Sequence, residues 1–182
     1  NLLEERSKRV RPGLDDKTLT SWNALVIQGL LDAHQAFHDK RFLEIAEKNA
    51  NFLRQNVLAE NGKLFHNWKK GQASVDGFLE DYSLLIQAYI SLFEASGDEL
   101  WINLAGKMTA YVFNHFYDEQ TGRFYFSTKK ENSVITNHFQ KEDNVLPASN
   151  SVMANNLHKM NLILGRPEYL KIAQNMLQHI TP

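Results

Sequence analysis

The sequence predicts an all-α fold of helical hairpin repeats that form part of an (α/α)6 toroid, with short β-strands between the hairpins. The first observation behind this fold class is a repeat: residues 21–28 align with residues 80–87 at an offset of 59, and a third copy begins near Ser149 at an offset of 68 from the second. The second is that each copy holds two apolar patterns of helix length. A unit of this size cannot bury its apolar face alone, so stacked neighbours are expected.

A third observation separates a closed toroid from an open solenoid. A glycine turn and a strand-like segment follow the second helix of the first two copies, where Asn61–Phe65 aligns with Thr121–Tyr125 after one inserted residue. The copies also differ in length. Both features favour the toroid.

Six helices are expected, in three pairs of an inner and an outer helix. Their expected ranges are Ser21–His38, Arg41–Val57, Phe78–Ala95, Glu99–Phe116, Ser149–Leu164 and Pro167–His179. The first member of each pair is apolar along its length, whereas charges return with the helical period in the second. Thr20 or Ser21 is the expected N-cap of the first helix. Pro167 suits the first position of the last one.

Apolar stripes at helical spacing define the expected core. The stripe of the first helix contains Trp22, Leu25, Val26, Gly29, Leu30, Ala33 and Phe37, and that of the third contains Leu79, Tyr82, Leu85, Ile86, Tyr89, Ile90 and Phe93. Large side chains at such spacing are more often core than cofactor site. We therefore also expect Phe37, Phe52, Phe93, Trp101, Phe116 and Met160 inside.

Short strands are expected over Lys63–Trp68, after the turn signal Asn61-Gly62, and over Arg123–Ser127. The segment Lys129–Asp143 is polar and is expected to be the longest loop.

Composition excludes several classes of function. The chain has 182 residues, is 43% hydrophobic and carries a formal net charge of −1. This balance gives no electrostatic reason to expect nucleic acid or an anionic membrane as partner. The absence of cysteine excludes disulfides, a thiol nucleophile and thiolate metal sites. No run approaches the ~20 apolar residues that span a bilayer, and no signal peptide is visible, so a cytoplasmic location is expected.

The domain organisation is expected to be one domain, residues 1–182, that forms about half of a toroid. The chain begins at Asn1 within a charged, helix-like stretch and stops at Pro182 directly after a helical pattern. We interpret it as a fragment of a longer protein. Half a ring cannot close a cavity, so the fragment by itself is expected to be inactive.

Three polar segments stand out against the apolar repeat. They are 11–17, 76–82 and 143–151, and each one leads into an inner helix. In a toroid, the loops that enter the inner helices meet at one end of the central cavity. By the repeat offsets, Trp22, Asp81 and Ser149 are equivalent positions. The same offsets make Asn23, Tyr82 and Asn150 equivalent.

We call this end of the cavity the mouth, and its residues have two interpretations. Aromatic faces, amides and carboxylates suit a sugar-like ligand, and two carboxylates can serve as general acid and base. Asp16 and Asp81 are the catalytic candidates. The binding candidates are Arg11, Asp15, Lys17, Trp22, Asn23, Glu80, Tyr82, Ser149 and Asn150. The alternative is helix capping, which requires the same residue types at helix starts.

Asp81 carries most weight because it lies inside an apolar helix, where a carboxylate needs a partner or a wet cavity. Arg11 or Lys17 could be that partner. The histidines form no metal-binding pattern, and neither a metal nor a cofactor is expected. His66, in an expected strand, is a candidate proton carrier at the mouth, although a satisfied surface histidine is the more frequent case.

These segments also resemble a known family. Arg11-Pro12, Asp15-Asp16-Lys17 and Thr20–Asn23 resemble the signature "RP-x-x-DDK-x-x-TSWN" of a thioredoxin-domain-containing family that includes the spermatogenesis-associated thioredoxin-like proteins. Gly77–Tyr82 is similar to its "GFLEDYA" segment, and Pro147–Ser151 to its "PSgNS" segment. The departures are Ala24 for glycine, Ser83 for alanine and Ala148-Ser149 for Ser-Gly.

The resemblance implies an N-terminal thioredoxin-like domain followed by a six-hairpin toroid similar to N-acylglucosamine 2-epimerases and six-hairpin glycosidases. It implies fold and motif positions rather than a reaction. The catalytic histidines of the epimerases have no matching residues here, which argues against simple epimerase activity. Two hypotheses follow: a carbohydrate-active or carbohydrate-binding toroid, or a non-catalytic substrate- or partner-binding module that serves a redox thioredoxin-like domain.

Overall fold

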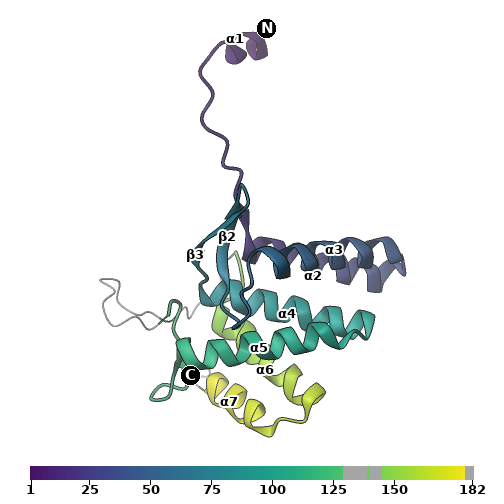
Figure 1. The fold of residues 1–182 in the computed structure, drawn as a ribbon, viewed down its shortest axis with the longest axis vertical. Helices are drawn as coiled ribbons and strands as arrows, with labels where there is room; N and C mark the ends of the chain where they lie inside the picture. Colours follow the sequence, from purple (N-terminus) through teal and green to yellow (C-terminus); the bar gives the residue numbers. More distant parts are fainter. Residues whose placement is uncertain (129–138, 140–144, 179–182) are drawn as a thin grey trace.

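The fold consists of three helical hairpins arranged as an inner and an outer layer (Figure 1). The computed structural model describes residues 1–128, 139 and 145–178. The inner helices are α2 (Thr20–Phe37), α4 (Leu79–Ser96) and α6 (Ser149–Leu164), and the outer helices are α3 (Lys40–Asn56), α5 (Glu99–Phe116) and α7 (Pro167–Gln178). Helix α4 packs on α2 and α6, and each outer helix packs on the inner helix before it. The six expected helices and the all-α class are therefore confirmed. Of the expected last helix, His179 lies outside the described residues.

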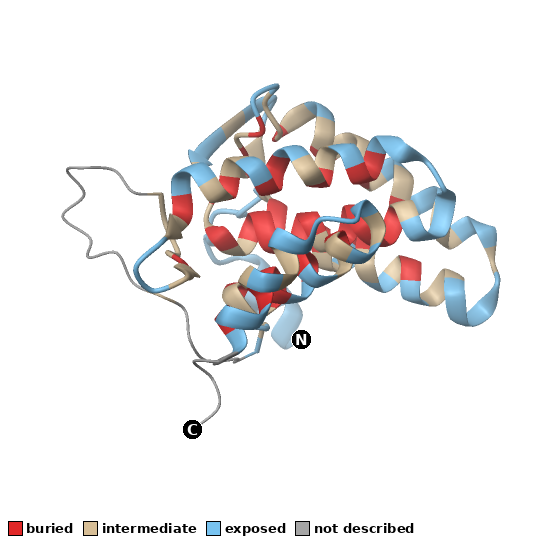
Figure 2. Ribbon diagram, turned by 90° about the horizontal axis from the view of Figure 1, so that it is seen from below, coloured by how far each residue is buried: buried red, intermediate tan, exposed pale blue. Residues whose placement is uncertain are grey.

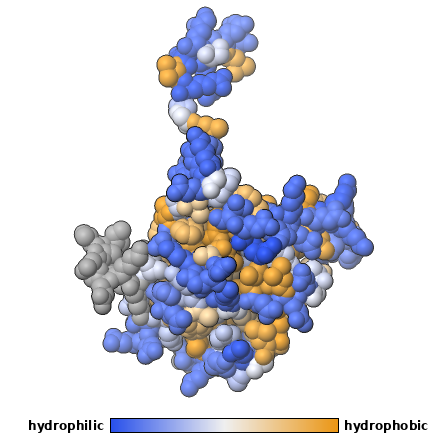
Figure 3. Space-filling view, in the orientation of Figure 1, coloured by the Kyte–Doolittle hydropathy of each residue, from blue (hydrophilic) through white to orange (hydrophobic). Residues whose placement is uncertain are grey.

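A short helix, α1 (Leu2–Ser7), precedes the hairpins and has no buried residue. An extended segment joins it to the body, so that the N-terminus projects away from the hairpins (Figures 1 and 3). The face seen in Figure 3 is mainly hydrophilic, with apolar patches on the body.

Two small antiparallel sheets lie where the inner helices begin (Figure 1). The first has the order β1-β2-β3, with β1 (Thr18–Leu19), β2 (Phe65–Lys69) and β3 (Gln72–Asp76). The second pairs β4 (Tyr117–Asp118) with β5 (Arg123–Phe124). Strand β5 falls within one expected strand segment and β2 overlaps the other, ending one residue beyond it at Lys69, whereas β1, β3 and β4 are not expected from the sequence. The expected loop Lys129–Asp143 lies, apart from residue 139, outside the described residues.

The core lies between the two helical layers (Figure 2) and is richest on α4. Twelve residues of α4 are buried, including Leu85, Ile86 and Tyr89. Trp101, Phe116 and Met160 are also buried, as expected, while Phe52 and Phe93 pack partly buried against the core.

The expected stripe of α2 needs a correction. Trp22, Val26 and Phe37 are 64%, 55% and 73% exposed, whereas the buried positions of α2 are Thr20, Ser21, Ala24, Ile27 and Leu31. Among the described residues, α2 packs on one inner neighbour only, α4. Its buried face is therefore the one turned toward α3 and α4, and it includes two hydroxyl side chains that an apolar pattern cannot select.

The residues that cap the helices recur at equivalent positions of the repeat. The Asp39 and Asp98 side chains cap the outer helices by accepting hydrogen bonds from the amides of Arg41 and Leu100, 2.9 Å in each case. Gly97 and Gly165 end α4 and α6 in the left-handed conformation. The expected cap of α2 is wrong: its N-cap is Leu19, which has no side-chain cap bond.

Candidate functional site

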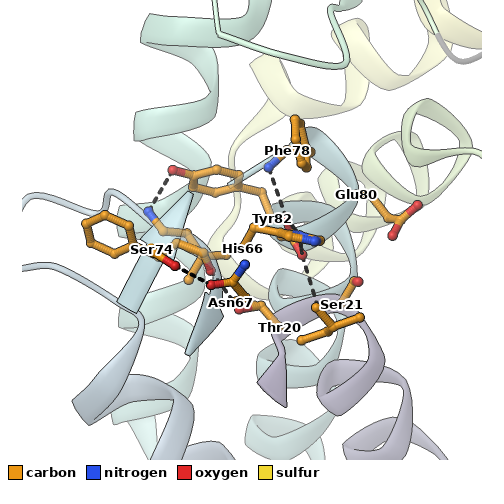
Figure 4. A network of polar contacts seen from close by, with 12 residues as sticks. Thr20, Ser21, His66, Asn67, Ser74, Phe78, Glu80 and Tyr82 are labelled. Carbon is orange, nitrogen blue, oxygen red and sulfur yellow. Dashed lines mark hydrogen bonds and ion pairs between the residues drawn. The ribbon is translucent and has the colours of Figure 1, made fainter. Parts of the chain in front are cut away.

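The candidate site lies where α2 and α4 begin beside strand β2 (Figure 4). Two contacts hold the strand there. The hydroxyl of Thr20 donates a hydrogen bond of 2.6 Å to the carbonyl oxygen of Phe65, and the hydroxyl of Ser74 on β3 donates one of 2.6 Å to the Asn67 side chain. These bonds fix the position of His66, which lies between Phe65 and Asn67.

Asp81 is at the centre of this site and is fully buried. Its carboxylate accepts hydrogen bonds from the backbone amides of Phe78, at 2.9 Å, and Ser21, at 3.1 Å. One carboxylate therefore caps the first turns of two helices, α4 and its neighbour α2, where the helix dipoles favour negative charge. This bond explains why α2 needs no capping side chain of its own.

The third partner of Asp81 is His66, whose Nδ1 lies 2.9 Å from the carboxylate Oδ2. The ion-pair partner of the buried carboxylate is thus His66, and neither Arg11 nor Lys17 occupies that place. The hydrogen bond to Asp81 raises the pKa of His66 above its ordinary value of 6.5, and burial opposes the shift. The Glu80 charge adds to the increase, whereas Lys17 acts against it. The net effect of these surroundings is to favour the imidazolium form.

The geometry leaves the second imidazole nitrogen available for chemistry. Nδ1 is used by Asp81, and within the described residues no hydrogen bond engages Nε2. The His66 side chain is 25% exposed, against 1% for Asp81. An imidazole held through Nδ1 by a carboxylate, with Nε2 open, can give or take a proton at Nε2.

An aromatic wall stands beside the imidazole. The Phe78 ring meets the His66 ring edge to face at 5.2 Å and stacks on Phe126 at 5.2 Å with an interplanar angle of 12°. The amide of Leu79 donates to the carbonyl of Phe126, which joins this segment to the start of α4. The sequence does not distinguish either phenylalanine from a core residue, because aromatic residues are more often core. Phe78 does fall within the "GFLEDYA"-like segment.

Several predicted residues lie away from His66 and Asp81. Asp15, Asp16 and Arg11 are exposed in the extended segment before α2. Asp15 pairs with Lys17 at 3.4 Å, and Asp16 pairs with Lys69 of β2. The Lys69 ammonium lowers the pKa of Asp16. The structure therefore brings Asp81 into contact with His66, and the charges of Glu80 and Lys17 are near enough to act on the imidazole. The two catalytic candidates, Asp16 and Asp81, have separate partners.

Two residues of the second set of equivalent positions, Tyr82 and Asn150, form hydrogen bonds with the backbone of a β-bridge and a strand, respectively. The amide of Leu64 donates to the Tyr82 hydroxyl at 2.7 Å, and the amide of Phe124 donates to the Asn150 side chain at 3.0 Å. Leu64 and Phe124 are themselves equivalent in the repeat. The Tyr82 hydroxyl and the Asn150 side-chain amide therefore have the same structural role in the second and third copies. In the first copy, Asn23 bonds to the Leu19 carbonyl of its own helix start.

The remaining candidates are Trp22 and Ser149. Trp22 lies on the exposed side of the first turn of α2, while Ser149 is fully buried at the first position of α6. Ser21, next to Trp22, has a buried hydroxyl oxygen without a hydrogen-bond partner in the described part of the chain. Over the same residues, no three His, Cys, Asp or Glu side chains form a group that could hold a metal ion.

Solved structures define the class of the fold. The chain superposes on a GH76 alpha-mannanase of Bacteroides thetaiotaomicron with a TM-score of 0.73 at 16% identity, covering 94% of this chain and 45% of that one. It superposes on cellobiose 2-epimerase of Spirochaeta thermophila with a TM-score of 0.71 at 13% identity, covering 89% and 42%. At these identities the likeness shows fold alone. The chain has the fold of part of an (α/α)6 toroid.

The chain has curated sequence relatives, although no protein-family model matches it. An uncharacterised protein of Caenorhabditis elegans is 31% identical over 177 residues, which cover 92% of this chain and 24% of that protein. Human spermatogenesis-associated protein 20 is 26% identical over 179 residues, covering 93% and 23%. The chain is homologous to a region of the spermatogenesis-associated protein 20-like family, and it spans about a quarter of the length of these curated relatives. None of the helices in the described part is long and apolar enough to cross a membrane.

Proposed function

We propose that the chain supplies a carbohydrate-active site in which His66 transfers protons and Asp81 orients the imidazole. The observation that carries this proposal is the 2.9 Å contact between His66 Nδ1 and the buried carboxylate of Asp81. Asp81 has no exposed oxygen with which to meet a ligand, so its proposed role is positioning rather than direct catalysis. His66 takes the place of the second carboxylate that the sequence suggested in Asp16.

The proton transfer uses the open nitrogen of the imidazole. In the charged form, His66 Nε2–H donates to an oxygen of the ligand, and the imidazolium becomes a neutral imidazole. The glycosidic C–O bond to that oxygen breaks, water attacks the anomeric carbon, and the proton that the water loses returns to Nε2. The raised pKa of His66 favours the charged form, which is the form that acts as an acid.

A sugar-like ligand suits the surroundings of His66. Phe78 and Phe126 present aromatic surface against which sugar C–H groups can pack, and Glu80 is a partly exposed hydrogen-bond acceptor beside the imidazole. The structural neighbours include a mannanase and an epimerase of cellobiose, which supports this ligand class at the level of fold analogy.

The chain is further proposed to be about half of a complete toroid. It contains three hairpins and covers 42% and 45% of the two toroids named above. The exposed side of α2, with Trp22 and Val26, would then pack against the remainder of the ring, and the mouth would be completed by helices outside this chain.

The test is a turnover assay of the intact protein with mannan oligosaccharides and cellobiose, comparing His66→Gln with wild type. Glutamine retains hydrogen-bonding ability but carries no titrating proton, so the rate is expected to fall by at least about 100-fold. The matched control is His158→Gln, which changes an exposed histidine of α6 and is expected to retain full activity. Equal rates for His66→Gln and wild type would contradict the proposal.

A second candidate is a non-catalytic module that serves a thioredoxin-like domain elsewhere in the intact protein. The absence of cysteine in this chain fits such a division of roles. A thiol-exchange assay of the intact protein, with and without this region, addresses it. Unchanged exchange after deletion of the region would eliminate the module hypothesis.

A further inference from the structure

A second polar cavity lies on the inner helices, away from His66. It has a volume of about 630 Å³, within the range of small-molecule pockets, and its lining includes Gln28, Asp32, Gln35, Ser91, Glu94 and Lys159. Asp32 follows Ser21 by eleven residues on α2, so the cavity is about 16 Å further along the helix axis than the site at His66. The cavity is lined by all three inner helices, and most of its residues lie in the C-terminal halves of α2 and α4.

The repeat itself builds this cavity. The offsets of 59 and 68 make Asp32, Ser91 and Lys159 equivalent positions of α2, α4 and α6, and all three line the cavity. Gln35 and Glu94 are equivalent by the first offset. Each inner helix therefore turns the same face toward one space. That face has three different chemistries at one repeat position: a carboxylate, a hydroxyl and an ammonium group.

The lining combines hydrogen-bond donors and acceptors that are already oriented by one another. Lys159 Nζ lies 3.0 Å from Glu94 Oε2, which links α6 to α4, and the Gln28 amide donates to Asp32 at 2.9 Å. The two groups of the ion pair are 33% and 46% exposed, so their remaining hydrogen-bonding capacity faces the solvent.

This chemistry discriminates between classes of ligand. Two carboxylates against one ammonium group disfavour an anion, and a wall dominated by amide, hydroxyl and charged groups disfavours an apolar molecule. The lining also contains His34 and His38, but among the described residues no three His, Cys, Asp or Glu side chains form a group that could hold a metal ion, which argues against a divalent cation. Alternating donors and acceptors match the hydroxyl groups of a neutral polyol.

We propose that this cavity binds a neutral saccharide unit, at a site separate from His66. The inference does not rest on the proposed function, because binding at Asp32, Ser91 and Lys159 requires no proton transfer by His66.

The experiment is calorimetric titration of the intact protein with mannobiose and with cellobiose. Saturable binding of at least one disaccharide is expected. The double variant Asp32→Ala/Lys159→Ala removes two wall groups and is expected to weaken binding at least about tenfold, as two hydrogen bonds are lost. Both residues lie on the surface of their helices, so the variant is expected to keep the wild-type circular dichroism spectrum and melting temperature.

Three further titrations make the result decisive. Glu44→Ala/Lys107→Ala, with the same change of charge on exposed outer-helix positions, is expected to bind as wild type. His66→Gln is also expected to bind as wild type at this site. Calcium chloride in place of sugar is expected to give no saturable heat. The proposal is overturned by absent disaccharide binding, by unchanged affinity of the Asp32→Ala/Lys159→Ala variant, by loss of binding in His66→Gln, or by calcium binding at the cavity.

Discussion

Helices α2 and α4 are equivalent helices of the first and second copies of the repeat, yet they have different surroundings. The two helices have equal lengths of 18 residues, and both are rich in apolar residues. Helix α4 packs on an inner helix at each side and on α5, and it buries twelve residues. Helix α2 has α4 and α3 as its neighbours and buries five residues.

The difference is clearest at matched positions. Ile27 and Ile86 are equivalent and both fully buried, whereas Val26 is 55% exposed and its equivalent Leu85 is fully buried. A residue on this side of the helix is therefore buried only where a second inner helix packs against it, as α6 does on α4. The apolar pattern therefore indicates a helix that can be buried, and the neighbouring helices determine which of its sides is buried.

Truncation at the matched pair is expected to give the largest contrast. Leu85→Ala should lower the free energy of unfolding by about 2–5 kcal/mol, because it leaves a cavity in the core. Val26→Ala should change it by no more than about 0.5 kcal/mol, as an exposed position does. Urea denaturation of both variants measures the contrast. Equal losses would mean that α2 is covered as fully as α4.

The strand-holding side chains provide a second contrast between copies. Tyr82→Phe leaves the buried amide of Leu64 without an acceptor, and Asn150→Ala leaves that of Phe124 without one. Each should cost about 1–3 kcal/mol of unfolding free energy. Asn23→Ala, at the equivalent position of α2, removes only a bond within its own helix and should cost less than about 1 kcal/mol. Thermal melts can rank the three, and a loss for Asn23→Ala as large as the other two would refute the equivalence of roles.

The smallest expected effect is the pH dependence contributed by His66. Its folded-state pKa is raised above 6.5 by Asp81, so its stabilising contribution is complete below about pH 6.5 and is lost as the pH rises through the folded-state pKa. Unfolding free energy measured by urea titration between pH 6 and 9 should fall over this window. His66→Gln should flatten the profile, whereas His158→Gln should not. An unfolding free energy that rises with pH over this range would contradict a raised folded-state pKa of His66.

Part of the site could be predicted from the sequence. Asp81 was singled out because a carboxylate inside an apolar helix needs a partner, and His66 because of its place in a strand at the mouth. Their pairing could not be predicted, because it depends on where β2 lies relative to α4, and the two residues are 15 positions apart. The same holds for the bond from the Ser21 amide, which joins two copies of the repeat.

The repeat that aligns the helix starts also aligns residues of the second cavity. The offsets that align Trp22, Asp81 and Ser149 also align Asp32, Ser91 and Lys159. Exposed polar residues in the middle of helices usually mark a solvated face, so nothing in the sequence alone separates these three from such a face. The shared cavity separates them.

The sequence by itself determined the hairpin repeat, the six helices, the Asp39 and Asp98 caps and the left-handed ends at Gly97 and Gly165. These features depend on residues a few positions apart along the chain, so local chemistry is sufficient. The tertiary structure decided which side of α2 is buried, that Tyr82 and Asn150 hold strands, and that His66 is the partner of Asp81. Those outcomes depend on residues brought together by helix and strand packing, which is set by the free energy of the assembled core rather than by any one segment.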